Sequence, residues 1–203
     1  WNWEFGLHRD QITDTEWIRD YGFKVIYGNW SYLKNKYAKK EDYAGRQLAW
    51  VSFLLGKRES RRLKGDIILS QVNIENDEKW EDSCVTTTWP IDLHYPIYSK
   101  NYKEEPFRVY CRKKKIKPFA IPYRCFYSRN IPNLFMAGRN ISVTHVTLGS
   151  TRVMRTSGLI GEVVGLAASI CKEKNCCPRE VYTKYLDLLK EKMIQGVPMN
   201  SRI

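Results

Sequence analysis

The sequence predicts an α/β fold of the mixed α+β type, and three observations lead to this prediction. Residues 64–74 and 85–89 are rich in residues that favour strands. Residues 151–172 contain no proline and carry apolar side chains on nearly every face, which predicts a long interior helix with Ser150 as its N-cap. The chain has 203 residues, 43% of them hydrophobic, so it can bury a core, and its composition excludes a disordered or fibrous protein.

Two helices are expected near the N-terminus. The capping-box pattern of Thr13 and Glu16 precedes apolar residues at helical spacing, and it predicts a helix over 14–27. A second helix is expected over 42–55, because apolar residues recur there and Gly56 supplies a stop signal.

The middle and the end of the chain show different patterns. Residues 95–122 hold four prolines and the basic run 112–117, which predicts an extended connection or irregular hairpin with its charges in solvent. Residues 133–138 form an apolar run closed by a glycine and predict a short buried strand. Pro178 fits the first turn of a closing helix that Gly196 ends. The apolar stripe of this helix consists of Val181, Tyr185, Leu188, Leu189 and Ile194.

The charge balance leaves several classes of partner open. The 34 Lys and Arg residues exceed the 22 Asp and Glu residues, and the resulting net charge of +12 suits nucleic acid, anionic lipid or a phosphate-bearing ligand. A basic nucleic-acid-binding module is therefore one alternative, although the chain has no recognised binding motif, and a non-catalytic interaction domain is another. The longest nearly uncharged apolar stretch, 163–171, falls short of the roughly 20 residues that span a membrane. The 6 cysteines include no C-x-x-C pair, which argues against zinc and indicates reduced thiols.

The segment 133–165 carries the strongest indication of a binding site. A strand that ends at Gly138 and a helix that starts near Thr151 bring unpaired backbone N–H groups to one place. The positive end of the helix dipole lies there too, so the segment favours an anion or an oxygen atom of a ligand.

The same helix has one face without side chains, because Gly158, Gly161 and Gly165 recur at helical spacing. Each glycine costs the helix about 1 kcal/mol relative to alanine, so the close approach of another group is the expected compensation. Packing against a sheet and contact with a flat ligand both remain open as that compensation.

One long motif resembles a known family. Residues 133–156 read Asn-Leu-Phe-Met-Ala-Gly-Arg-Asn-Ile-Ser-x-Thr-His-Val-x-Leu-Gly-Ser-Thr-Arg-Val-Met-x-Thr, and Gly161-x-x-x-Gly-x-Ala-Ala follows. This motif closely resembles the C-terminal flavin-binding segment of a bacterial family of FAD-dependent oxidoreductases. That family is sometimes described as related to xanthan lyase and is distantly similar to fumarate reductase flavoproteins. Shorter similar pieces, among them Trp3-Glu4-Phe5-Gly6 and Gly56-Lys-Arg-Glu-Ser-Arg-Arg-Leu63, extend the resemblance over most of the chain.

The resemblance implies a division of the chain and a set of cofactor contacts. Residues 1–125 are expected to form the substrate-side region, 126–174 the C-terminal FAD-binding segment, and 175–203 a terminal helix and tail. Many relatives have an acidic residue where this chain has Arg139 and Asn140, and Asn140 is the candidate to replace that contact. The residues implied as flavin contacts are Gly138, Arg139, Asn140, Ser142 and the amides of Arg152, Val153 and Met154.

The nucleotide-binding half of such a fold is not recognisable in this sequence. Enzymes of this type carry G-x-G-x-x-G, which holds the FAD pyrophosphate. In this sequence no two glycines lie two positions apart, as the first two glycines of that motif do. We therefore interpret the chain as the C-terminal half of a two-domain FAD-binding fold whose missing N-terminal half is its partner. We expect the chain alone to bind FAD weakly or not at all. Any signal peptide would lie in that missing half, so the compartment stays open, with a leaning towards the cytoplasm.

The catalytic candidates are the histidines, because only their side chains titrate near neutral pH without perturbation. His145 lies between the expected flavin turn and the helix, and His94 lies near Asp92; a structural role for either remains open. Arg61 and Arg62 are candidates to bind an anionic small-molecule substrate, and a structural role at the seam between domains is the alternative. The resemblance implies that the whole protein transfers a hydride between such a substrate and FAD.

Overall fold

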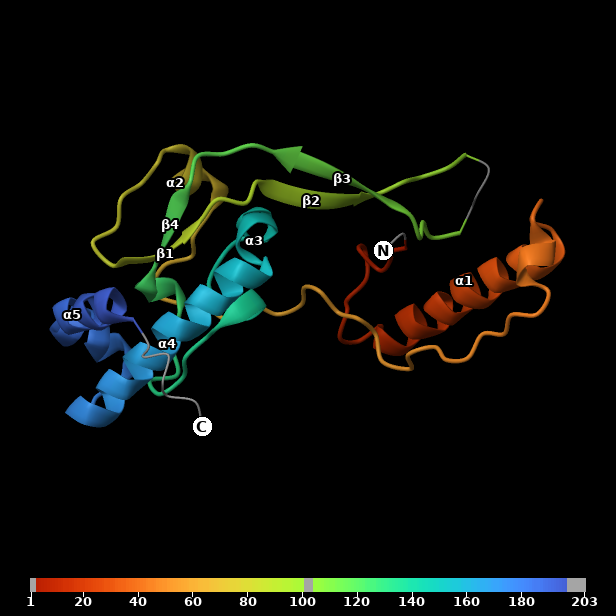
Figure 1. Cartoon of the computed structure of the whole chain (residues 1–203). Coiled ribbons are helices and arrows are strands. Elements are labelled where there is room, and N and C mark those ends of the chain that lie inside the picture. Colours follow the sequence, from red (N-terminus) through yellow and green to blue (C-terminus); the bar gives the residue numbers. More distant parts are fainter. Residues whose placement is uncertain (1–2, 101–103, 197–203) are drawn as a thin grey trace. The chain divides into compact units, whose positions relative to one another are not determined.

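The computed structural model describes residues 3–100 and 104–196, which form two compact units (Figure 1). The first unit combines Trp1–Ser60 with His94–Cys111, and we call it the N-terminal unit. The second combines Arg61–Leu93 with Arg112–Ile203, and we call it the C-terminal unit. Helices and small antiparallel sheets make up both units, which confirms the expected mixed α+β class.

Helix α1 (Thr15–Asn35) is the main element of the N-terminal unit. Its buried face presents Ile18, Tyr21 and Val25, whose spacing places them on one side of a helix. The helix expected over 14–27 is therefore confirmed, and it extends beyond the expected end to Asn35.

The expected capping box of α1 is wrong. The N-cap is Asp14, whose side chain makes no capping hydrogen bond. The N–H groups of Ile12 and Thr13 instead donate to the side chain of Asp10, at 2.8 and 3.3 Å. Thr13 is thus held in the turn before the helix and does not cap it.

The helix expected over 42–55 is also wrong. A short 3-10 turn, η1 (Lys40–Tyr43), is followed by a stretch without regular structure. Trp50 and Leu54 are 78% and 79% exposed there. An isolated amphipathic segment is only marginally helical in water, because most helical stability in proteins comes from packing of the apolar face.

The C-terminal unit has a core built on one antiparallel pair of strands. Strand β1 (Ser83–Thr87) pairs with β4 (Phe119–Pro122), and the buried residues Val85 and Ile121 face each other in this register. The strand expected over 85–89 is therefore confirmed, with both its start and its end two residues earlier than expected.

The strand expected over 64–74 is wrong. Leu69 makes a single parallel bridge to Val143, and helix α2 (Gln71–Glu75) begins directly after it. Ser70 and Asn73 form a capping box at this point, and local side-chain bonds of this kind favour a helix start over a continuing strand.

A second sheet consists of β2 (Ile91–Pro96) and β3 (Val109–Lys114). The division between the two units falls within both strands. The irregular hairpin expected over 95–122 is thus confirmed, with parts of three strands in that range. The charges of the basic run 112–117 are exposed, as expected.

The strand expected over 133–138 is reduced to one bridge. Phe135 pairs with Tyr127, and the N–H of Met136 donates to the carbonyl of Phe126 at 2.7 Å. The chain then turns through the 3-10 segment η3 (Gly138–Asn140), where Gly138 has a φ of 85° that favours glycine.

The long helix expected over 151–172 is interrupted. Helix α3 (His145–Thr151) ends before Arg152, and α4 (Met154–Lys174) begins after Val153, with a bend of 93° between them. Ser150 is therefore a residue of α3 and not the N-cap of the long helix. Among the described residues no single helix is long and apolar enough to cross a membrane; α3 and α4 pass that test only as a bent pair, and core helices pass it too.

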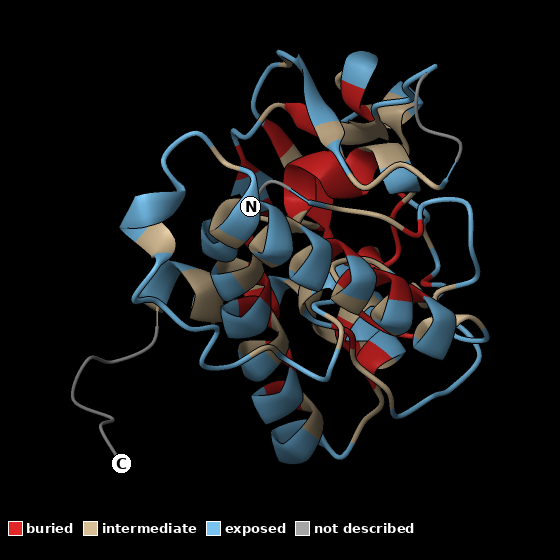
Figure 2. Cartoon of the chain, turned by 90° about the vertical axis from the view of Figure 1, so that its right-hand side faces the viewer, coloured by how far each residue is buried: buried red, intermediate tan, exposed pale blue. Residues whose placement is uncertain are grey.

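Helix α4 is buried on one face and not on nearly every face, which corrects the expectation. The buried side chains are those of Thr156, Ile160, Val163, Ala167 and Ile170. Figure 2 shows this division on several helices, with buried residues in red and exposed residues in pale blue. Gly158, Gly161 and Gly165 are exposed, and a Cβ added at any of them would meet nothing within 4 Å.

Helix α5 (Pro178–Gln195) packs against α4. Pro178 lies in its first turn and Gly196 caps its end, as expected. Val181 and Leu189 of the expected stripe are buried, whereas Ile194 is 87% exposed and does not belong to it.

The cysteines give the C-terminal unit a predictable response to alkaline pH. All 6 are free thiols, and burial raises the pKa of Cys125 from 9.0 to about 12. The unfolded chain loses this proton first, so the associated stability is complete below pH 9.0 and falls as the pH rises towards 12. We expect the unfolding free energy, measured in urea, to decline by up to about 1.4 kcal/mol per pH unit from this thiol alone. Cys125→Ala should reduce the slope.

Candidate functional site

The two helix starts on either side of the bend differ in their capping. The side chain of Thr144 accepts a hydrogen bond from the N–H of Thr147 at 3.5 Å and caps α3. The N-cap of α4 is Val153, which provides no side-chain bond, and the first turn of α4 contains no acidic residue. Met154 in that turn is 91% exposed. The start of α4 therefore presents an exposed positive helix end without a side-chain cap.

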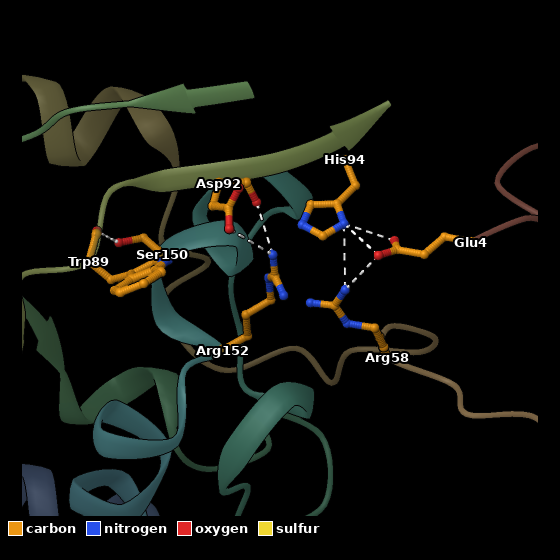
Figure 3. Close-up of polar contacts among 7 residues, drawn as sticks. All are labelled: Glu4, Arg58, Trp89, Asp92, His94, Ser150 and Arg152. Carbon is orange, nitrogen blue, oxygen red and sulfur yellow. Dashed lines mark hydrogen bonds and ion pairs between the residues drawn. The ribbon is translucent and has the colours of Figure 1, made fainter. Parts of the chain in front are cut away.

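Buried hydroxyl groups fix the bend between α3 and α4. The hydroxyl of Ser150 donates to the carbonyl of Trp89 (Figure 3). Thr87 donates to the carbonyl of Ser150 at 3.3 Å and accepts from the hydroxyl of Thr156 at 3.0 Å. These contacts join both helices to the end of β1, so they hold the start of α4 in place.

Arg152 takes part in this anchoring. Its guanidinium Nη2 donates to the carbonyl of Asp92 at 3.2 Å and lies 3.6 Å from the Asp92 carboxylate (Figure 3). Its backbone N–H donates to the carbonyl of Leu148 at 3.1 Å and so belongs to the end of α3. Of the three amides predicted to face flavin, those of Val153 and Met154 lie at the start of α4 itself.

The other predicted contacts lie in the η3 turn or directly after it, and only Arg139 among them is exposed. Arg139 is exposed, and the backbone carbonyl of Asn140 accepts from the N–H of Leu63 at 3.0 Å. The side-chain oxygen of Asn140 is buried and has no hydrogen-bond partner within residues 3–100 and 104–196. Ser142 is 1% exposed and packs against Gly65, so it lies in the interior.

The two candidate histidines have different surroundings. His145 is the exposed first residue of α3. His94 lies on β2 in the N-terminal unit, and its Nδ1 is 2.8 Å from both carboxylate oxygens of Glu4 (Figure 3). Arg58 Nη1 lies 3.0 Å from Glu4 Oε1. Sequence reasoning did not connect Glu4 or Arg58 with His94, although both occur in the short pieces that carry the resemblance.

The predicted substrate-binding arginines do not belong to the unit that contains His94 and Glu4. Arg61 is exposed and Arg62 half-buried, and both lie in the C-terminal unit, whereas Arg58 lies in the N-terminal unit. Their role towards an anionic substrate stays a prediction.

The residues of the η3 turn and of the start of α4 are chemically suited to FAD. The side-chain oxygen of Asn140 is a buried acceptor that the described part of the chain leaves without a donor, and the ribityl chain of FAD offers hydroxyl donors. The start of α4 adds amides and the positive end of a 21-residue helix, which suit the electron-rich pyrimidine end of flavin.

Comparison with known proteins gives one match. The sequence model of a protein family described as FAD dependent oxidoreductase matches residues 2–193. No curated protein and no solved structure matches the chain. The matched range includes both candidate histidines, the η3 turn and the start of α4.

Proposed function

We propose that this chain, which belongs to the family of FAD dependent oxidoreductases, forms the flavin-facing part of an enzyme that transfers a hydride between a small organic substrate and FAD. The observation that supports this most strongly is the exposed start of α4, which has no side-chain cap and no acidic residue in its first turn. A helix of this length is stabilised by an electron-rich partner at that end.

The η3 turn, the start of α4 and the buried hydroxyls that hold it each have a task in this proposal. Bound FAD would supply the hydride chemistry itself. The amides of Val153 and Met154 would stabilise negative charge at the pyrimidine end of the ring, and Asn140 would accept from the ribityl chain. The buried hydroxyls of Thr87, Ser150 and Thr156 would keep these groups in place without contact to the cofactor.

We further propose that the FAD pyrophosphate is bound by a dinucleotide fold supplied from outside residues 1–203. The chain has no G-x-G-x-x-G, and the glycine face of α4 is exposed. Three helix glycines without a packing partner carry a cost of about 1 kcal/mol each, which close packing of that fold would offset.

The experiment is a flavin titration of residues 1–203 and of the longer protein that contains them. We expect the longer protein to retain FAD, with absorbance bands of bound flavin, and residues 1–203 alone to bind it weakly. A longer protein that is colourless and does not bind added FAD would refute the proposed FAD-dependent function. A tight stoichiometric FAD complex of residues 1–203 alone would refute only the proposal that a dinucleotide fold from outside this range binds the pyrophosphate.

Asn140→Ala should separate stability from cofactor binding. Leaving a buried polar atom without a partner costs about 1–3 kcal/mol, so its removal should leave the FAD-free protein equally stable or more stable. The same substitution should weaken FAD binding about tenfold, which corresponds to one lost hydrogen bond of about 1.4 kcal/mol. Urea unfolding and flavin titration measure the two effects.

Thr151→Ala is the matched control, since its hydroxyl is also buried without a partner in the part of the chain that the structure describes. Because Thr151 is a buried residue of α3 and is not one of the implied flavin contacts, we expect unchanged FAD affinity for this variant. Equal losses of affinity in both variants would contradict the assignment of Asn140.

A further inference from the structure

We propose that Cys171 and Cys176 form a dithiol site, which a small-molecule disulfide oxidises to a disulfide bond between the last turn of α4 and the turn before α5. Both residues lie in the C-terminal unit, so the site is complete within that unit. The inference goes beyond the proposed function, because it concerns a covalent modification that needs no FAD.

The end of α4 brings the two residues together. Asn175 follows the helix in the left-handed conformation, with a φ of 48°. The N–H of Cys176 then donates to the carbonyl of Cys171 at 3.0 Å. This bond is typical of the Schellman motif, in which the chain folds back on the last turn of the helix. A backbone bond of this length keeps the two Cα atoms within the range of about 4.4–6.8 Å that a disulfide spans.

The side chains of the pair are in contact as well. Two residues in these positions of a Schellman motif frequently make an apolar contact. Here both are cysteines, and the thiol of Cys171 donates a hydrogen bond to the sulfur of Cys176. An apolar pair would close the helix end equally well, so two thiols in contact add a chemistry that the cap itself does not require.

The same hydrogen bond determines which thiol reacts first. Burial and the neighbouring Cys176 raise the pKa of Cys171 to about 12. Burial raises the pKa of Cys176 too, but the bond that it accepts from Cys171 stabilises its thiolate and opposes this effect. Because the thiolate is the nucleophile, Cys176 attacks the oxidant and Cys171 reacts second.

Two other thiols of the C-terminal unit are bonded to the backbone. The thiol of Cys84 donates to the carbonyl of Ile121 at 3.3 Å, and that of Cys125 donates to the carbonyl of Ile67 at 3.6 Å. Cys125 is also buried, whereas Cys171 and Cys176 are only half-buried, so a reagent in solvent reaches this pair. Cys177 is half-buried beside the pair and is the competitor that the test must separate.

The oxidation balances in two steps. The thiolate of Cys176 attacks one sulfur of the small disulfide, whose S–S bond breaks, and the other sulfur leaves as a thiolate with the electron pair. Cys171 gives its proton to this thiolate and attacks the sulfur of Cys176, which releases the second small thiol. The two protein thiols are thus oxidised to one disulfide, and the small disulfide is reduced to two thiols.

The test is treatment of the reduced 203-residue chain with oxidised glutathione, followed by trypsin and mass spectrometry. Trypsin cleaves after Lys172, Lys174 and Arg179, so it places Cys171 and Cys176 on different peptides. We expect the chain to lose about 2 Da, the mass of two hydrogens, and the peptides 156–172 and 175–179 to be linked. The urea midpoint of the oxidised chain should rise, because the new bond constrains the unfolded state.

Cys177→Ser is the matched control and should keep the link between the two peptides, whereas Cys176→Ser should abolish it. Loss of the link in Cys177→Ser would assign the bond to Cys177 and overturn the inference. A wild-type chain that stops with one glutathione bound to Cys176 would overturn it as well, because Cys171 would then not complete the exchange. The wild type and Cys177→Ser decide the pairing even where Cys176→Ser does not fold, and the flavin titration does not affect the result.

Discussion

Replacing Asp82 with alanine is expected to lower the free energy of unfolding by about 3–5 kcal/mol. The carboxylate of Asp82 is 0% exposed and accepts from three nitrogens of Arg124: the backbone N at 3.0 Å, Nε at 2.9 Å and Nη2 at 2.8 Å. Removal of the carboxylate leaves the charge of Arg124, which is 20% exposed, without its partner. Urea unfolding followed by circular dichroism measures the loss.

Arg179→Ala is the matched control for this prediction, because it removes an exposed ion pair and leaves Asp66 its hydrogen bond from the buried Tyr127. Asp66 also binds an arginine through two nitrogens, Nε of Arg179 at 2.9 Å and Nη2 of the same residue at 2.5 Å. These side chains are 28% and 48% exposed, so water competes for both charges, and the expected cost is about 1 kcal/mol or less. Equal losses for the two variants would show that burial does not set the strength of these ion pairs.

Burial of apolar side chains explains which elements the sequence predicts correctly. Helix α1 and strand β1 carry apolar residues that find partners within their own unit, and periodicity alone identifies them. The segment 42–55 has similar periodicity, but Trp50 and Leu54 remain exposed and no helix forms. Periodicity shows that a face is apolar and does not show whether another element covers it.

Local capping explains other differences. Ser70 and Asn73 turn an expected strand into α2, and the hydroxyls of Thr87, Ser150 and Thr156 stabilise a bend in what reads as one helix. The capping box is local, but the bonds of Thr87 to Ser150 and Thr156 join residues 63 and 69 positions apart, so they are not visible in a local pattern.

Only part of the candidate site can be predicted from the sequence, because some of its contacts join residues far apart in the chain. The turn at Gly138 and a helix after it follow from the local pattern, and the flavin contacts follow only from the resemblance to a known family. The carboxylate partner of His94 follows from neither, because Glu4 lies 90 positions away and only the folded chain brings the two together.

Substitution of alanine for Gly65 is expected to destabilise the protein by about 3 kcal/mol, at the upper end of the cost of overpacking. A Cβ at Gly65 would lie 2.3 Å from the carbonyl oxygen of Arg124 and 3.1 Å from that of Tyr127. Both are backbone atoms in the core, so they cannot move aside as a flexible side chain would. The measurement is again the free energy of unfolding in urea.

Gly161→Ala should have the opposite effect. Gly161 lies inside α4 and its Cβ would meet nothing within 4 Å, so alanine should stabilise the helix by about 1 kcal/mol. In the longer protein the same methyl group would lie on the face that we propose packs against the dinucleotide fold, and it should weaken FAD retention there. Stabilisation of residues 1–203 together with unchanged flavin content in the longer protein would contradict that packing. The two glycines thus distinguish a constraint within the chain from a constraint that the proposed dinucleotide fold would impose.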